Sequence, residues 1–251
     1  MNDVPRTLPF GAAETLAGVA GAERVLDAGC GSGRLTVALA DTGAAVTGID
    51  TNTRQLGQAR GRAEKAGVEL TLLEADFNAP LPFADASFDA VTSRLALMAA
   101  DDAVATLTEL RRVLEPGGRL VTVLWAAPDE NPWFSVPREA IGAVLGPEQA
   151  SFARAFGKLG DPDEATAVHR AAGLAEVTAV RVRGTRTTPD AASYWKELAA
   201  ENGHFRRVSA GLGESEAAAL ARELQDRLAP YSEGTRLVLP RTLVLVTARV
   251  A

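Results

Sequence analysis

Apolar residues in the first half of the chain alternate between short continuous runs and helical spacing. The short runs predict buried strands at residues 24–29, 45–50, 69–76, 90–97 and 119–125. Apolar positions three and four residues apart predict helices over 8–19, 33–43, 53–65 and 103–114. Strands that alternate with helices of this length favour parallel pairing through right-handed crossovers. The pattern therefore predicts an α/β sheet that reaches about residue 126, with a turn at "EPGG" before its fifth strand.

The second half of the chain has a different pattern, because helical spacing dominates there. Residues 126–137 are typical of a loop, and helices are expected over 138–145, 164–172 and 189–228, the last with a break near Asn202–Gly203. Alternating apolar residues at 175–184 and 241–250 predict two late strands. Because these strands frame the helical stretch, we expect an antiparallel hairpin at the sheet edge with helices inserted over one end.

Composition and charge narrow the classes of partner. The 251 residues are 47% hydrophobic and 23% charged, which is typical of a globular protein, and the net charge of −6 disfavours nucleic acid and anionic membranes. The single cysteine, Cys30, excludes an internal disulfide and a cysteine-rich metal site, and no metal is predicted. No signal peptide and no membrane-spanning apolar run is evident, so we expect a cytoplasmic protein, as a monomer or homodimer.

Three glycines, Gly29, Gly31 and Gly33, follow the first strand at alternate positions. Glycine of this density between a strand and a helix lets a ligand approach the backbone amides closely. The dinucleotide fingerprint GxGxxG fails in both registers, because Arg34 or Thr36 stands where its third glycine belongs, and the P-loop lysine is absent.

Carboxylates at the predicted strand ends point to a different ligand. Asp27, two residues before Gly29, would repel a pyrophosphate but attract an ammonium or sulfonium group. Asp50 could accept both hydroxyls of a ribose, and Asp76 the amino group of an adenine whose ring meets Phe77. S-adenosylmethionine combines all of these groups. The alternative is that each aspartate only caps a helix.

Four segments, "VLDAGCGSG", "GIDTN", "LEADFNAPLPFADASFDAV" and "RRVLEPGGRLV", resemble the successive motifs of class I S-adenosylmethionine-dependent methyltransferases. The resemblance is to the type 11 small-molecule subgroup and covers about residues 20–126. It implies a Rossmann-like, seven-stranded, mostly parallel sheet with the last strand antiparallel. It further implies a single domain over residues 1–251, with a cofactor-binding core at 20–126 and a helical lid at 127–165 and 185–236.

The resemblance also implies roles for individual residues. Asp27, Gly29 and Gly31 would hold the methionine end of the cofactor, with Cys30 as a small filler of the same loop. The other implied cofactor residues are Asp50 and Thr51 at the ribose, Asp76 and Phe77 at the adenine, and Ser93 below the sulfonium.

Residues for the acceptor are harder to identify, because methyl transfer needs alignment more than a strong catalytic group. The candidate substrate residues are Arg94, Met98, Trp133, Tyr194 and Trp195. The aromatic ones could line an apolar acceptor pocket or form the core of the lid, and Arg94 could bind an acidic acceptor or pair with a neighbouring carboxylate.

Two histidines are candidates for a general base, which is needed only where the acceptor must lose a proton. His204, in the predicted lid, is the candidate catalytic base, or else an ordinary lid residue. His169 lies on a helix predicted beside the sheet, and we expect it at the surface.

The sequence therefore predicts an enzyme that transfers a methyl group to an oxygen, nitrogen or carbon atom of a small, apolar or aromatic metabolite, as in biosynthesis. The alternative is a protein of this fold that binds the cofactor but catalyses a cyclisation or rearrangement. A non-enzymatic cofactor-binding regulator would show a degraded cofactor motif, and this motif is intact.

Overall fold

The computed structural model describes residues 8–150 and 156–251. The chain divides into two compact units: unit 1, with Met1–Trp125, Gly157–Val182 and Leu243–Ala251, and unit 2, with Ala126–Phe156 and Arg183–Thr242. Unit 2 takes in most of both segments predicted as helical lid, while residues 157–165 belong to unit 1. The lid role stays a prediction. Residues 151–155, and the first seven residues used to judge the signal peptide, lie outside the described residues.

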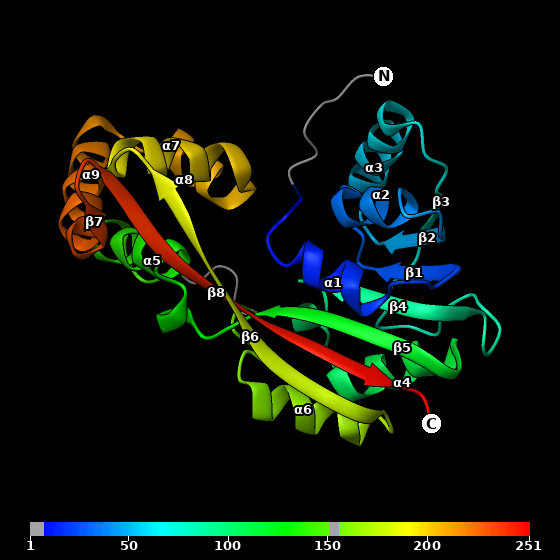
Figure 1. The fold of residues 1–251 in the computed structure, drawn as a ribbon. Helices are drawn as coiled ribbons and strands as arrows, with labels where there is room; N and C mark the ends of the chain where they lie inside the picture. The colour runs from blue at the N-terminus through cyan, green and yellow to red at the C-terminus, as the bar shows by residue number, and fades with distance from the viewer. Residues whose placement is uncertain (1–7, 151–155) are drawn as a thin grey trace. The chain divides into compact units, whose positions relative to one another are not determined.

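Unit 1 contains the predicted parallel sheet. Its parallel strands are β1 (Arg24–Ala28), β2 (Ala45–Asp50), β3 (Thr71–Glu74), β4 (Phe88–Arg94) and β5 (Leu114–Trp125). They lie in the order β3-β2-β1-β4-β5 (Figure 1). The chain adds strands first to one side of β1 and then, with β4, to its other side. Open α/β sheets bind ligands at such a point, here beside the carboxyl ends of β1, β2 and β4.

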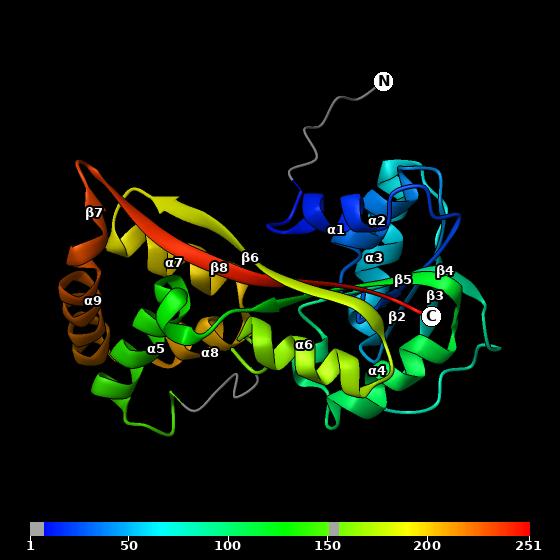
Figure 2. The same cartoon turned by 60° about the horizontal axis from the view of Figure 1, so that its bottom comes forward.

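Helices cover both faces of this sheet (Figures 1 and 2). One face carries α1 (Ala12–Gly18), α2 (Arg34–Ala40) and α3 (Thr53–Ala66), and the other carries α4 (Ala103–Arg112) and α6 (Pro162–Ala171). The side chains of Asn52, Asp102 and Asp161 accept hydrogen bonds from the first backbone amides of α3, α4 and α6. These caps fix where the helices begin.

The two late strands complete the sheet. β8 (Arg236–Arg249) pairs antiparallel with β5, and β6 (Ala175–Thr188) lies beyond it. The predicted mostly parallel sheet with an antiparallel last strand is confirmed, and its order places β6, rather than the last strand, at the edge. Both strands contribute residues to both units.

Unit 2 is built from helices around the remaining parts of β6 and β8. These are α5 (Pro132–Leu145), α7 (Ala191–Glu201), α8 (Gly203–Gly211) and α9 (Glu214–Leu228), with the two-residue strand β7 (Ser232–Glu233) paired to β8. The predicted break at Asn202 is confirmed, because its side chain accepts a hydrogen bond from the backbone of His204 and starts α8.

Two local predictions are wrong. The supposed loop over 126–137 contains the start of α5, whose first residue, Pro132, suits a first helical turn because it needs no backbone N–H there. The "EPGG" turn lies inside β5: Phe88 pairs with Leu114 and Ala90 with Arg119, so the extra residues bulge from a continuous strand.

Within residues 8–150 and 156–251, no helix combines the length and apolarity needed to cross a bilayer. In the same ranges, no group of three or more histidine, cysteine or acidic residues is arranged to hold a metal ion.

Candidate functional site

The glycine loop after β1 is tied to the end of β2 by its backbone. The amides of Gly29 and Cys30 both donate to the Ile49 carbonyl at 2.9 Å, and the Gly31 amide donates to Asp50 Oδ2 at 2.8 Å. Gly29 has φ +77°, and a Cβ there would lie 2.2 Å from the Cβ of Ala96. Only glycine therefore fits at this position.

Beside the loop lies a cavity of about 320 Å³, which we call the strand-end cavity. It is lined by Gly29, Asp50, Thr51, Ala75, Asp76, Phe77, Asn78, Ala96 and Ala99. These residues follow or end β1, β2, β3 and β4, and all belong to unit 1. The structure thus brings five of the predicted cofactor residues into one hollow, of a size found for small-ligand sites.

The charge of the strand-end cavity suits some ligands better than others. Its lining holds the carboxylates of Asp50 and Asp76 and no basic side chain. Asp50 Oδ1 accepts from the Asn52 amide at 2.8 Å, and Asp76 Oδ1 accepts from the Asn78 amide at 2.8 Å. Backbone groups thus orient both carboxylates, which can accept hydrogen bonds from ligand hydroxyl or amino groups but would repel a phosphate.

Asp27 is more deeply buried than the cavity lining, with 1% of its surface exposed. Its Oδ2 accepts from the Thr36 hydroxyl at 2.7 Å and its Oδ1 from the Thr92 hydroxyl at 3.0 Å. Burial raises the pKa of this carboxyl above its usual value, and the two hydroxyls and the positive charge of Arg94 oppose that rise. Its assignment to the methionine end stays a prediction.

For Asp27 and Asp50, the alternative that the aspartate only caps a helix does not hold. The residue at the cap position of α2 is Gly33, and that of α3 is Asn52, whose side chain accepts from the Gln55 amide. Asp27 and Asp50 instead bind the hydroxyls and backbone amides just described.

Several predicted residues lie outside the lining of the strand-end cavity. Cys30 is 8% exposed, and burial raises the pKa of its thiol, so it is poorly reactive. Ser93 and Met98 are 2% and 6% exposed. Their assignments, like that of Gly31, stay predictions.

Four lining residues were not predicted from the sequence: Ala75, Asn78, Ala96 and Ala99. The alanines carry no chemical signal, because they matter only by being small. Asn78 could have been found, since an Asp-Phe-Asn stretch at a strand end favours a local side-chain turn. Its Oδ1 accepts from the Asp101 amide at 3.1 Å and so joins two loops of the site.

Of the candidate acceptor residues of unit 2, Tyr194 lies in its apolar core, and Trp133 and Trp195 are partly buried and pack against that core. Tyr194 is fully buried and donates its hydroxyl to the Trp133 carbonyl, and the Trp133 indole donates to Asn131 Oδ1 at 3.0 Å. Trp195 packs edge-on against Phe205, with ring centroids 5.8 Å apart. These contacts match the lid-core alternative, and an acceptor role for the three aromatic residues stays a prediction.

His204 begins the first turn of α8, and its ring packs edge-on against Phe205 at 6.0 Å. Partial burial, together with the charge of Arg207, lowers the pKa of its imidazole. A role as base stays a prediction.

The expectation for His169 is wrong, because its side chain is completely buried between α6 and β5. Nδ1 donates to the Ala165 carbonyl at 2.7 Å, so Nε2 accepts from the Thr122 hydroxyl at 2.9 Å. Burial lowers the pKa of the imidazole. His169 is thus a neutral, fully hydrogen-bonded core residue.

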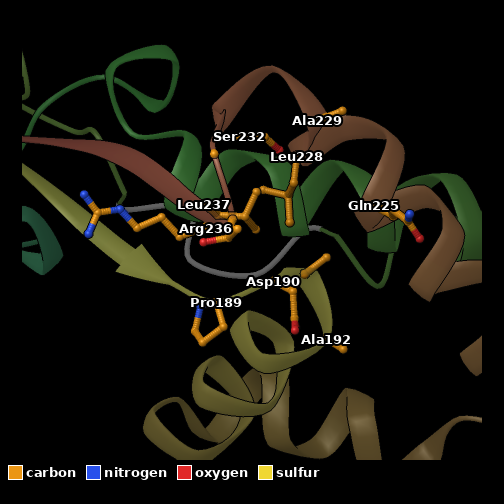
Figure 3. Close-up of a pocket in the computed structure, with 12 residues that line it drawn as sticks. Pro189, Asp190, Ala192, Gln225, Leu228, Ala229, Ser232, Arg236 and Leu237 are labelled. Atoms are coloured by element: carbon orange, nitrogen blue, oxygen red, sulfur yellow. The ribbon is translucent and has the colours of Figure 1, made fainter.

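A second cavity, of about 460 Å³, lies in unit 2 where α7 begins and α9 ends. Figure 3 shows Pro189, Asp190 and Ala192 on one side and Leu228, Ala229 and Ser232 on the other. Its carboxylate, that of Asp190, already accepts from the Ser193 amide at 2.7 Å as the cap of α7. None of the predicted site residues lines it.

Comparison with known proteins finds similarity in the part of the chain that carries the strand-end cavity. Residues 26–122 match the family model described as a methyltransferase domain. An uncharacterized protein of Mycobacterium tuberculosis is 40% identical over 109 residues, which cover 43% of this chain and 39% of that protein. A demethylmenaquinone methyltransferase of Tropheryma whipplei is 42% identical over 118 residues, 47% of this chain and 48% of that one. The chain thus spans about half, or less, of the length of these relatives.

Solved structures share the fold over nearly the whole chain. The YcgJ protein from Bacillus subtilis is 18% identical, with a TM-score of 0.62 over 95% of this chain and 97% of that one. The geranyl diphosphate C-methyltransferase of Streptomyces coelicolor, solved with S-adenosyl-L-homocysteine, is 21% identical, with a TM-score of 0.56 over 96% and 79%. The [4+2]-cyclase SpnF is 19% identical, with a TM-score of 0.56 over 95% and 81%.

Proposed function

We propose that the class I methyltransferase domain formed around residues 26–122 binds S-adenosylmethionine in the strand-end cavity and transfers its methyl group to a small molecule. One observation carries this proposal. Inside the matched domain, the cavity unites Asp50, Asp76 and the Phe77 ring next to a glycine that tolerates no side chain.

The chain's own groups have distinct tasks in this proposal. Asp50 accepts the ribose hydroxyls, while Asp76 and Phe77 recognise the adenine edge and face. Asp27 places negative charge behind the glycine loop, toward the ammonium of the methionine end. When bound, the cofactor supplies a methyl carbon already activated by the sulfonium, so the protein's contribution is to align the acceptor and exclude water.

The acceptor belongs to a broad class in this proposal: a small, apolar or aromatic metabolite methylated on oxygen, nitrogen or carbon. Names of similar proteins support a small molecule, since they include a demethylmenaquinone methyltransferase and a geranyl diphosphate C-methyltransferase.

A second candidate is a reaction without methyl transfer, such as a cyclisation. One observation favours this candidate: the chain shares its fold with the [4+2]-cyclase SpnF, so a protein of this fold can catalyse a cyclisation.

The experiment is to incubate the purified chain with methyl-labelled S-adenosylmethionine and a metabolite extract. We expect labelled product heavier by one methyl group, together with S-adenosylhomocysteine. If the cofactor binds but no label is transferred across a broad acceptor panel, the second candidate replaces the first.

A matched pair of variants assigns the activity to the strand-end cavity. Asp50→Ala removes the acceptor of the Gly31 amide and of the proposed ribose bonds, so binding of S-adenosylhomocysteine should weaken about a hundredfold. Asp226→Ala, at an exposed position of α9, is the control and should bind normally. Unchanged affinity in Asp50→Ala would contradict the proposed ribose role.

A further inference from the structure

Arg94, the last residue of β4, binds the backbone of the N-terminal segment. Its Nη2 donates to the Phe10 carbonyl at 2.8 Å and its Nε to the same oxygen at 3.3 Å. Two donors of one guanidinium therefore hold one carbonyl, a forked geometry that lysine cannot reproduce. This contact adds to the two roles expected for Arg94 from the sequence: its charge also acts on the neighbouring carboxyl of Asp27, and binding of an acidic acceptor stays a prediction.

The held segment, Phe10–Gly11, lies at the carboxyl edge of the sheet, and we call it the N-terminal wall. The Phe10 ring lies 6.4 Å from the ring of Trp125, the last residue of β5. Ala96, two residues after Arg94, lines the strand-end cavity and meets Gly29. Phe10 therefore lies at the edge where β4 and β5 end, the edge to which the proposal assigns the methionine end of the cofactor.

The electrostatics place Arg94 near the carboxylate assigned to that end. The positive charge of Arg94 opposes the burial effect on Asp27. If the ammonium group of a ligand binds near Asp27, two positive charges, this ammonium and Arg94, therefore interact with the same carboxylate. Arg94 can act on the cofactor in two opposite ways: by repelling the ammonium, or by holding the N-terminal wall against it.

Arg119 provides an internal comparison. Arg94 binds the backbone just before α1, and Arg119 binds the backbone just after it. Its Nη1 donates to the Ala20 carbonyl at 3.0 Å and its Nη2 to the Val19 carbonyl at 3.5 Å. Arg119 lies at the amino-terminal part of β5, opposite to Trp125 along the strand. Both arginines thus bind the backbone next to an end of α1 by the same chemistry, but Arg94 does so at the carboxyl end of its strand, two residues before Ala96 of the strand-end cavity.

We propose that Arg94 is a positioning residue that holds the N-terminal wall beside Asp27 and thereby retains the methionine end of the cofactor. The inference rests on the proposed function, because it takes the strand-end cavity as the cofactor site. The proposed role differs from simple anchoring of α1, because Arg119 also anchors this helix. It also differs from charge repulsion of the ligand ammonium, because loss of a repelling charge would strengthen binding.

The test compares adenosine and S-adenosylhomocysteine as ligands of wild type, Arg94→Met, Arg94→Lys and Arg119→Met. Adenosine lacks the methionine end, so its affinity reports only the ribose and adenine contacts. We expect Arg94→Met to weaken S-adenosylhomocysteine about tenfold, through faster dissociation, and to leave adenosine unchanged. Arg94→Lys should lie between wild type and Arg94→Met, and Arg119→Met should bind both ligands normally.

Hydrogen exchange of the ligand-free protein adds a readout that does not depend on the cofactor. Exchange in peptides covering residues 8–16 should be faster in Arg94→Met, while Arg119→Met should speed exchange near residues 19–23. If Arg94→Met does not fold, Phe10→Ala keeps the carbonyl and its arginine but removes the ring. It should weaken S-adenosylhomocysteine about threefold and leave adenosine unchanged.

Three results would overturn the proposal. Tighter binding of S-adenosylhomocysteine to Arg94→Met would show that charge repulsion dominates. Equal loss of adenosine and S-adenosylhomocysteine, or equal effects of Arg94→Met and Arg119→Met, would reduce Arg94 to an anchor. If the wild-type protein binds neither ligand, the proposed function is refuted instead. Faster exchange at residues 8–16 of ligand-free Arg94→Met would then still show that Arg94 holds the N-terminal wall.

Discussion

The strand ends of unit 1 and the apolar core of unit 2 use their polar side chains for opposite purposes. At the strand ends of unit 1, Asp50 and Asp76 bind backbone amides of loops and still face a cavity. In unit 2, Tyr194 and Asn131 are completely buried, and their polar groups bind neighbours within the core. The first arrangement leaves carboxylates open to a ligand, whereas the second uses polar groups to hold a core together.

This difference teaches which residue types identify a site in this chain. A carboxylate at a strand end that also lines a cavity indicates a site, because open α/β sheets bind their ligands at the carboxyl ends of the strands. An aromatic residue in a helical segment can either line an acceptor pocket or belong to the core. The sequence does not distinguish these roles, whereas the burial of the side chain in the structure does. The predictions that follow test whether changes at the strand-end cavity affect ligand binding and whether changes at buried polar side chains, in either unit, affect stability.

The largest effect should come from Gly29→Ala in unit 1. A new methyl group would meet Ala96 at 2.2 Å in a left-handed backbone, so we expect a loss of about 3 kcal/mol in unfolding free energy and no cofactor binding. Gly43→Ala is the control: it has φ +94° but nothing within 4 Å, and should cost about 1 kcal/mol through backbone strain alone. Chemical denaturation measures both, and equal losses would contradict the close-packing argument.

Asn131→Ala should give the largest effect in unit 2. The Asn131 amide donates to the Ala126 and Thr242 carbonyls and accepts from the Thr242 amide, all in buried surroundings. Leaving these groups unpaired should lower the unfolding free energy by about 3 kcal/mol, with normal affinity for S-adenosylhomocysteine in the folded protein. Asn78→Ala, in the strand-end cavity, should show the reverse, with weaker binding and little loss of stability. The same response in both variants would remove the distinction between the units.

The buried imidazole of His169 predicts a pH dependence of stability. Its pKa is lowered in the folded state, so the unfolded chain takes up the proton first. Stability is therefore complete above the ordinary histidine pKa of about 6.5 and falls as the pH drops below it, by up to about 1.4 kcal/mol per pH unit.

Denaturation midpoints between pH 8 and pH 5 measure this dependence. In His169→Gln the slope of the unfolding free energy against pH, below about pH 6.5, should decrease by the contribution of about one bound proton. His204→Gln should change the slope less, because the His204 ring is only partly buried. An unchanged slope in His169→Gln would contradict the neutral core role of His169.

Tyr194→Phe should have the smallest effect. It removes the hydrogen bond to the Trp133 carbonyl and should lower the unfolding free energy by about 1 kcal/mol, with no change in cofactor affinity. Once an acceptor is known, its KM should also stay unchanged. A raised KM with full stability would instead make Tyr194 an acceptor residue, as the alternative from the sequence has it.

The parts of the fold that were predictable share one physical origin. Buried parallel strands are continuous apolar runs, and β2 begins and ends as expected because both of its faces are covered. Asp50 and Asp76 were predictable for a related reason, since a strand end determines where the side chain lies. Ala96 was not, because its only property is that it is small enough to pack on Gly29.

Other features depend on contacts between distant segments. His169 could be recognised as a core residue only from Thr122, which lies 47 positions earlier in the chain. The role of Arg94 depends on the Phe10 carbonyl, 84 positions away, and no local pattern reports such a pairing.

Calorimetric titration with S-adenosylhomocysteine, and with NAD in a parallel experiment, tests the central claim most directly. The strand-end cavity offers carboxylates and no basic side chain, so S-adenosylhomocysteine should bind at one site per chain and NAD should not bind. The Asp50→Ala variant should lose this binding heat. Binding of NAD without S-adenosylhomocysteine would contradict the account.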